Sequence, residues 1–311
     1  MPERPCFMMS HLLRILFPAA GLAFGVLSIS WTPNPGNACF REGHAAEPPT
    51  FQNCTQCHTD FAADSGDGSF QLLGIPDYWQ AGQSYTLTAR LADPGQQRWG
   101  FRLTVRDEAF QDAGSLNPTD GNTELCQFDG HVFLRQTGPG SRPGVADGPV
   151  DFSFQWTAPA AGTGKVAFYA VGLACDWNNH PAGDYTYTAA SASLEMGDSA
   201  TWSVVLQPDG ALALGGQSWP VRMHVRNHAT QSQTALLVSR IRWPNGQIYP
   251  PAGWLTGPTP LDLAPQSSTT VEALHAIPVG VPLIQADYEA LLGQAPATLE
   301  ASDVQAFLLQ P

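Results

Sequence analysis

The sequence predicts an all-β protein, in which two consecutive antiparallel β-sandwiches follow a short irregular segment. Its 311 residues include 30 Gly and 27 Pro, and charged residues make up only 13%. Long surface helices need many Glu, Lys and Arg on their wet face, whereas short strands joined by turns do not. Apolar and polar residues also alternate in many short segments, which is typical of half-buried strands.

The N-terminal segment predicts export from the cytoplasm. Residues 12–30 read LLRILFPAAGLAFGVLSIS, in which Arg14 precedes an apolar run, and Ser28 and Ser30 offer small residues for cleavage. We therefore expect residues 1–30 to be a signal peptide, and the rest of the chain to reach the periplasm, the cell surface or the outside. An uncleaved N-terminal anchor is the alternative, and it is the only membrane attachment that the sequence suggests.

Residues 31–66 are expected to be irregular, and they contain the run CTQCH at residues 54–58. The Cys-x-x-Cys-His spacing supplies two thiols for the vinyl groups of a haem and a histidine for its iron. In an exported chain this motif predicts one covalent haem c. Cys54 and Cys57 would attach it, and His58 would be the proximal iron ligand. We find no arrangement of catalytic residues elsewhere in the sequence.

Three other interpretations of the motif remain open. A redox-active Cys-x-x-Cys pair normally belongs to a fold that alternates strands and helices, and this sequence shows no such alternation. A zinc site could combine Cys39 with Cys54, Cys57 and His58, although the gap between Cys39 and Cys54 is unusual for such sites. A structural disulfide is the third, because exported thiols tend to oxidise.

The sequence does not decide the sixth ligand of the iron. His180 is the first candidate, because it lies in a long loop, CDWNNHPAGD, that could fold over a haem edge. His131 is the second, and Met196 or an open position are further alternatives. Cys126 and Cys175 are candidates for a disulfide across the sandwich, which would leave Cys39 unpaired.

Residues 67–195 are expected to form the first sandwich. Alternation places one set of apolar side chains on a common face in each of three segments: Tyr85, Leu87, Ala89 and Leu91; Phe101, Leu103 and Val105; Phe152, Phe154 and Trp156. Residues 165–171 are a more continuous apolar run, as in a central strand, and residues 184–190 alternate again. Six or seven short strands at this spacing predict an antiparallel sandwich.

Residues 196–311 are expected to form a second sandwich of immunoglobulin-like size. Its strands are indicated by Trp202, Val204 and Leu206, by Val221, Met223 and Val225, and by a hairpin that turns at residues 244–246. Residues 287–294 fit either a strand or a helical turn.

Residues 50–192 resemble the choice-of-anchor V family of bacterial proteins, which is related to the reeler sandwich. The resemblance rests on CTQCH, DYWQAGQSYTLTARL, WGFRLTV and FQWTAPAAGTGKVAFYAVGLACDWNNHPAGDYTYT. It implies a β-sandwich that carries a haem-type segment on an exported or surface-attached protein, with Cys54, Cys57 and His58 as the matching positions. Two features depart from the family: Gln136 and Thr137 stand where members often have His-Thr, and a second sandwich replaces the usual C-terminal anchor.

These observations together favour an electron carrier over an enzyme. We expect an exported, monohaem c-type cytochrome-like protein that transfers electrons in the periplasm or at the cell surface. A homo-oligomer with haem at its interface is compatible with this role, and the sequence does not identify the redox partner. The net charge of −13 disfavours nucleic acid as a partner. The alternative is a haem-free extracellular interaction or adhesion module with a structural Cys-x-x-Cys.

Overall fold

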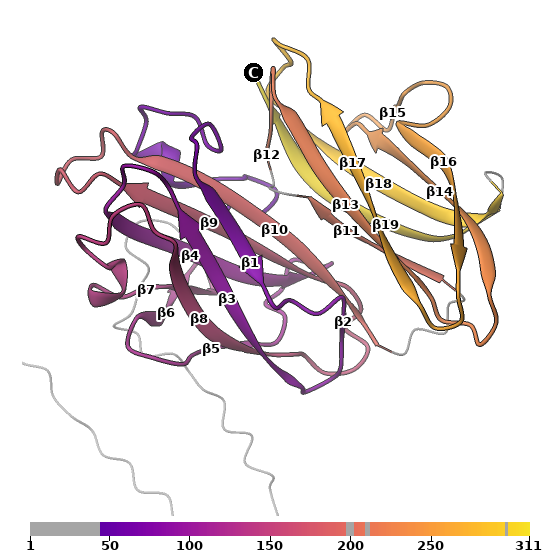
Figure 1. The fold of residues 1–311 in the computed structure, drawn as a ribbon, viewed down its shortest axis with the longest axis horizontal. Coiled ribbons are helices and arrows are strands. Elements are labelled where there is room, and N and C mark those ends of the chain that lie inside the picture. The colour runs from indigo at the N-terminus through magenta and orange to yellow at the C-terminus, as the bar shows by residue number, and fades with distance from the viewer. Residues whose placement is uncertain (1–43, 197–201, 209–211, 296–297) are drawn as a thin grey trace, which may run out of the picture. The chain divides into compact units, whose positions relative to one another are not determined.

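Strand pairing builds two β-sandwiches along the chain (Figure 1). In the computed structural model, the described residues are 44–196, 202–208, 212–295 and 298–311. The predicted signal peptide and Cys39 lie outside these ranges. The regular structure of the described residues consists of strands and two single-turn 3-10 helices, so the predicted all-β class is confirmed.

Ten strands form the first sandwich. They are β1 (Ser69–Leu73), β2 (Tyr78–Trp79), β3 (Ser84–Ala92), β4 (Arg98–Asp107), β5 (Ser115–Pro118), β6 (Thr123–Phe128), β7 (His131–Gln136), β8 (Val150–Thr157), β9 (Val166–Cys175) and β10 (Tyr185–Glu195). One sheet has the order β1-β3-β8-β5, and the other has the order β2-β10-β9-β4-β7-β6. The short β2 runs parallel to β10, and the other pairs are antiparallel.

The alternating side chains of these strands make the core, as the sequence predicts. Leu87 of β3, Leu103 of β4 and Trp156 of β8 are each at most 1% exposed. The rings of Phe101 and Phe152 stack across the two sheets with centroids 4.4 Å apart. The near-continuous apolar run of β9 occupies a central position between β10 and β4, where both of its faces are covered.

Nine strands form the second sandwich. They are β11 (Trp202–Pro208), β12 (Leu212–Leu214), β13 (Ser218–Asn227), β14 (Gln233–Arg242), β15 (Ile248–Tyr249), β16 (Thr256–Leu263), β17 (Ser268–Ala276), β18 (Ile284–Ala295) and β19 (Thr298–Gln310). One sheet is β11-β13-β17, and the other is β12-β19-β18-β14-β15, with β16 also paired to β14. Residues 287–294, which fit strand or helix in sequence, lie within β18.

Residues 44–66 pack on the outer face of the six-stranded sheet of the first sandwich. Ala45 is fully buried in a small cluster with Phe133 of β7 and with Ala167 and Tyr169 of β9, apart from the main core. Phe61 stacks on Tyr185 at the start of β10, with ring centroids 4.1 Å apart. The irregular segment is therefore held against the sheet by its own apolar side chains.

None of the helices in the described part of the chain has the length and apolar character that crossing a bilayer requires.

Candidate functional site

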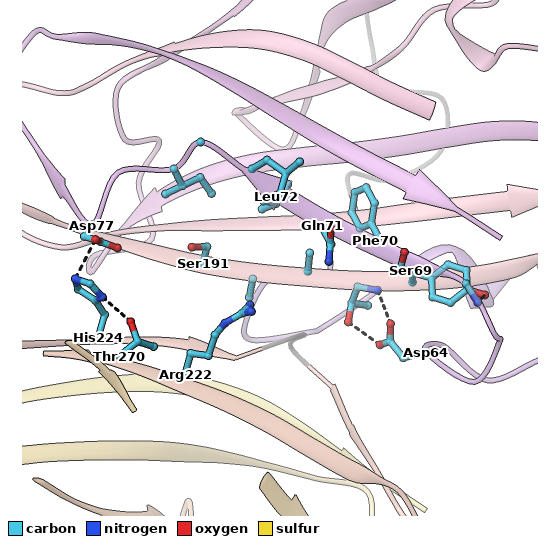
Figure 2. Close-up of a pocket in the computed structure, with 18 of the residues that line it drawn as sticks. Asp64, Ser69, Phe70, Gln71, Leu72, Asp77, Ser191, Arg222, His224 and Thr270 are labelled. Carbon is cyan, nitrogen blue, oxygen red and sulfur yellow. Dashed lines mark hydrogen bonds and ion pairs between the residues drawn. The ribbon is translucent and has the colours of Figure 1, made fainter. Parts of the chain in front are cut away.

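A cavity of about 690 Å³ is lined by β1, β10, β13 and β17 (Figure 2). Two of its titratable side chains, His224 and Asp64, contact other residues of the lining. Nε2 of His224 lies 2.9 Å from Oδ2 of Asp77, and Nδ1 of His224 lies 3.0 Å from Oγ1 of Thr270. Asp64 accepts hydrogen bonds from Thr188. No residue singled out in the sequence lines this cavity, and we assign no chemistry to it.

The CTQCH run folds into one tight turn, which contains all three of its reactive residues. Residues 54–56 form a 3-10 helix, whose N-cap Asn53 accepts hydrogen bonds from the backbone N–H (3.0 Å) and the hydroxyl (2.8 Å) of Thr55. The N–H groups of Cys57 and His58 both donate to the carbonyl of Cys54, at 3.1 and 3.0 Å. One backbone turn therefore holds Cys54, Cys57 and His58 close together in the chain.

The two thiols of the motif are free in the structure. Burial raises the pKa of Cys54 to about 11, although nearby Arg102 opposes this shift. A thiolate is the form that ligates zinc or attacks a disulfide, and a pKa this high disfavours it. A thioether carries no charge, so covalent attachment of a haem at this sulfur would involve no buried thiolate.

His58 is held in place by the carboxylate of Asp184, which lies 126 residues later in the chain. Its Nδ1 lies 2.6 Å from Oδ2 of Asp184, and the two side chains are 25% and 2% exposed. A carboxylate only accepts hydrogen bonds, so Nδ1 carries the proton and the lone pair of His58 is on Nε2. This is the usual arrangement of a metal-binding histidine, whose second nitrogen donates to a carboxylate or a carbonyl.

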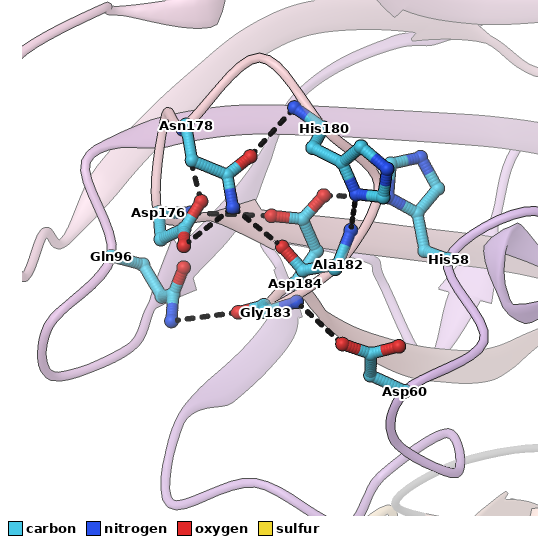
Figure 3. A network of polar contacts seen from close by, with 9 residues as sticks. All are labelled: His58, Asp60, Gln96, Asp176, Asn178, His180, Ala182, Gly183 and Asp184. Atoms are coloured by element: carbon cyan, nitrogen blue, oxygen red, sulfur yellow. Dashed lines mark hydrogen bonds and ion pairs between the residues drawn. The ribbon is translucent and has the colours of Figure 1, made fainter.

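The loop that presents Asp184 is closed by its own polar groups (Figure 3). Asn178 donates from its side chain to Oδ2 of Asp176 (2.9 Å) and to the carbonyl of Ala182 (2.8 Å). Gly183 has φ of +85°, and a Cβ at this position would lie 2.7 Å from Oδ2 of Asp176. The N–H of Gly183 also donates to Oδ2 of Asp60 at 3.0 Å, which ties the loop to the residues that follow the motif.

His180 lies in the same network, but its tautomer does not suit iron binding through Nε2. The backbone N–H of Ala182 donates to Nδ1 of His180 at 3.1 Å. A neutral imidazole that accepts at Nδ1 carries its proton on Nε2, which leaves Nε2 without a lone pair. His180 would have to release Ala182 before it could bind a metal, whereas His58 is already in the correct form.

The structure does not place the other two sixth-ligand candidates beside His58. His131 lies 2.7 Å from Arg106, near the C-terminal end of β4. Arg98, at the other end of β4, pairs with Cys175, which directly precedes the loop that presents Asp184. Met196 follows the last residue of β10, whereas Asp184 precedes the first. Eleven residues of strand separate them by about 35 Å.

The predicted disulfide between Cys126 and Cys175 is wrong. Cys126 is disulfide-bonded, but Cys175 is a free thiol. The two residues lie in the same sheet and not in facing sheets, because β6 and β9 are separated by β7 and β4. Three strand spacings amount to about 14 Å, which is far beyond the reach of a disulfide.

Arginines gather beside the motif on the outer face of the six-stranded sheet. Arg102 of β4 lies directly opposite Arg135 of β7, and Arg98 lies opposite Cys175. A groove of about 320 Å³ runs past Arg98, Arg135 and Cys175. Like charges that face each other across strands are unfavourable. Glu124 pairs with Arg135 at 2.9 Å, and a ligand carboxylate would add to this compensation.

The residues at this site fit a covalently bound haem better than a bare metal ion. Among the described residues, no group of three or more His, Cys, Asp and Glu side chains is arranged to hold a metal ion. The zinc alternative also needs Cys39, which lies outside the described ranges. A haem needs only two thiols and one histidine with a free Nε2, and the turn supplies these.

Asp184 and the three arginines have no sequence signal that marks them as part of the site. Asp184 is 126 residues away from His58, in a glycine-containing turn where an aspartate is ordinary. Arg98 and Arg102 are four residues apart in β4, and Arg135 lies in β7. They form one patch only because the strand register places them near one another.

Comparisons with known proteins add little to this site. No protein-family model matches the chain, so membership of the choice-of-anchor V family is not confirmed, and no curated protein matches it in sequence. Solved structures that it resembles include the human F-spondin reeler domain, with 22% identity over 43% of this chain and 93% of that one, at a TM-score of 0.32. The reelin-N domain of F-spondin has 23% identity over 46% and 96%, at a TM-score of 0.33. Salmonella alpha-2-macroglobulin has 14% identity over 78% and 16%, at a TM-score of 0.28. TM-scores this low carry no argument about function.

Proposed function

We propose that this chain is an exported monohaem c-type cytochrome-like protein that transfers electrons in the periplasm or at the cell surface. The observation that carries the proposal is a single backbone turn that holds Cys54, Cys57 and His58, with Nδ1 of His58 bonded to Asp184. Two free thiols and one histidine with an open Nε2 are what covalent haem attachment requires.

In this proposal the protein holds and orients the cofactor, and haem supplies one-electron chemistry when it is bound. Cys54 and Cys57 would carry the thioether bonds, and Nε2 of His58 would bind the iron. Arg98 and Arg135, which line the groove beside Cys175, would face the carboxylates of the haem edge. Their positive charges would attract these carboxylates.

An electron carrier suits this surface better than a catalyst does. Cys57 is exposed and His58 is one quarter exposed, so a haem attached here would lie at the molecular surface. Electron exchange needs only close approach of a partner to the haem edge. Such an exposed haem would also suit a homo-oligomer in which a second copy covers it.

The decisive experiment is expression with the c-type maturation system, followed by a denaturing gel stained for haem peroxidase activity. We expect a stained band at the mass of the processed chain and a pyridine haemochrome spectrum typical of two thioether bonds. Cys54→Ser with Cys57→Ser should abolish the stain. Cys175→Ala should retain it, because this third free thiol lies outside the motif.

The opposite result would support the haem-free alternative. An unstained band whose intact mass shows two hydrogens fewer, with Cys54 and Cys57 blocked to alkylation, would mean a structural disulfide. In that case the chain would be an extracellular interaction or adhesion module.

A further inference from the structure

We propose that Asp184 sets the electronic character of His58, and thereby holds the reduction potential of the bound iron low. Asp184 is a positioning residue in this proposal, because it would act on the iron only through the imidazole. The inference rests on the proposed function, since it concerns the same cofactor.

The geometry of the pair is that of a strong, directed hydrogen bond. Nδ1 of His58 lies 2.6 Å from Oδ2 of Asp184, whose side chain is only 2% exposed. Hydrogen bonds to an ionised acceptor are shorter and stronger than neutral ones, and low local dielectric strengthens them further. Water therefore competes little for this carboxylate oxygen.

A further donor holds Asp184 in its position. The backbone N–H of Asp176 donates to Oδ1 at 3.2 Å. The loop around it is fixed by Asn178 and by the bond from Gly183 to Asp60 (Figure 3). Asp184 thus faces His58 from a rigid, buried site, and it does not swing in from solvent.

The effect on the iron follows from the hydrogen-bond partner of Nδ1 of His58, which is a carboxylate. A carboxylate that accepts from Nδ1–H raises the electron density and the basicity of the imidazole, which a neutral carbonyl does much less. A more basic ligand stabilises the more highly charged, oxidised iron, and hydrogen bonding around a ligand is one of the ways in which proteins tune a haem. Asp184 would therefore favour the ferric state.

A purely structural role is the competing explanation. The same ion pair ties residue 58 to the loop before β10, so its function could be only to dock the motif segment on the sandwich. The two explanations differ in the reduction potential, which a docking contact need not change.

The test is redox titration of the haem-loaded, full chain for the wild type and two variants. Asp184→Asn keeps a side-chain oxygen for His58 but removes the charge, and we expect the ratio of ferrous to ferric affinity to rise at least tenfold. That change corresponds to an increase of about 59 mV in the midpoint potential for one electron.

The matched control is Asp60→Asn. It removes one carboxylate from the same loop network, where Asp60 accepts from Gly183 and does not touch His58. We expect the potential of this variant to stay close to that of the wild type. Equal shifts in Asp184→Asn and Asp60→Asn would mean that only general charge matters and would overturn the proposal, as would an unchanged potential in Asp184→Asn.

A measurement on the haem-free protein separates this inference from the proposed function. The ¹⁵N chemical shifts of the His58 ring should show the proton on Nδ1 in the wild type, and a mixture of tautomers in Asp184→Asn. A proton on Nε2 in the wild type would overturn the role of Asp184 whether or not haem binds. Failure to load haem, with the tautomer as expected, would reject only the proposed function.

Discussion

A single carboxyl group, Asp64, anchors the end of the irregular segment to the first sandwich. It accepts from the N–H and the hydroxyl of Thr188, at 2.6 and 2.7 Å. Burial raises its pKa from 3.8 to about 7. The folded chain therefore binds more protons than the unfolded chain between about pH 4 and pH 7. Its free energy of unfolding should fall across this range as pH rises, by on the order of 1–3 kcal/mol.

Urea unfolding at several pH values tests this expectation, with Asp64→Asn as the variant. An asparagine can accept from the N–H of Thr188 and donate to its hydroxyl, so both contacts are retained while the titration is lost. We expect the pH dependence between about pH 4 and pH 7 to become shallower in the variant. The same slope in both proteins would show that other carboxyl groups cause it.

His180 and His58 differ at the residue scale in what their Nδ1 atoms contact. His58 meets a carboxylate, and His180 meets a backbone N–H. We therefore expect His180→Ala to leave the visible absorption spectrum of the haem-loaded protein unchanged, whereas His58→Ala should alter it strongly. A loss of the low-spin spectrum in His180→Ala would show that the loop rearranges and supplies the sixth ligand.

The sequence identifies the reactive residues but not the groups that control them. Cys54, Cys57 and His58 are adjacent in the chain, so their spacing alone is informative. Asp184 comes close to His58 only because β9 and β10 fold back under the motif. The contact between Asp184 and His58 is a tertiary contact, so no local sequence pattern predicts it.

The loop from residue 176 to residue 184 is the element that connects the motif to the sheet, and its backbone geometry depends on Gly183. Alanine at this position would hold φ near +85° and place a Cβ 2.7 Å from Oδ2 of Asp176. We expect Gly183→Ala to lower the free energy of unfolding by about 2 kcal/mol and to reduce haem loading.

Gly162→Ala is the control for backbone strain alone. Gly162 has φ of +88°, but a Cβ added there would have no atom of the described residues within 4 Å. We expect a cost of about 1 kcal/mol and normal loading in this variant. Equal costs in thermal or chemical denaturation would mean that the contact with Asp176 contributes nothing.

Strands in which apolar and polar residues clearly alternate could be predicted from sequence. Strands that are short, or that are polar on both faces, could not. The segments that became β3, β4 and β8 each bury one face, so the period of two identifies them. β5 and β6 are short, and most of their side chains are at least partly exposed, so nothing in their pattern separates them from loops. The disulfide between Cys126 and Cys175 was predicted wrongly for the same reason. Without the position of β6, the sequence does not show that the two residues lie in one sheet.

At the scale of the whole molecule, an acidic chain presents a locally basic face. The sequence has 27 acidic and 14 basic residues, whereas Arg98, Arg102 and Arg135 lie together beside the motif. At about 0.1 M salt the Debye length is about 10 Å, so charges near the haem outweigh the distant net charge. One charged side chain near the haem should therefore change the approach of an anionic oxidant more than an equally charged distant one.

Stopped-flow oxidation of the reduced, haem-loaded protein by ferricyanide tests whether local charge or net charge governs the approach of the oxidant. We expect Arg98→Ala to slow the reaction a few-fold at about 0.1 M salt, because one positive charge near the haem edge is removed. Arg90→Ala is the matched control, since it removes the same charge from β3, where Arg90 pairs with Asp151 at 2.7 Å. Equal rates in the two variants would mean that net charge controls the encounter. A slower rate in Arg98→Ala alone would place the electron-transfer surface on the arginine face of the six-stranded sheet.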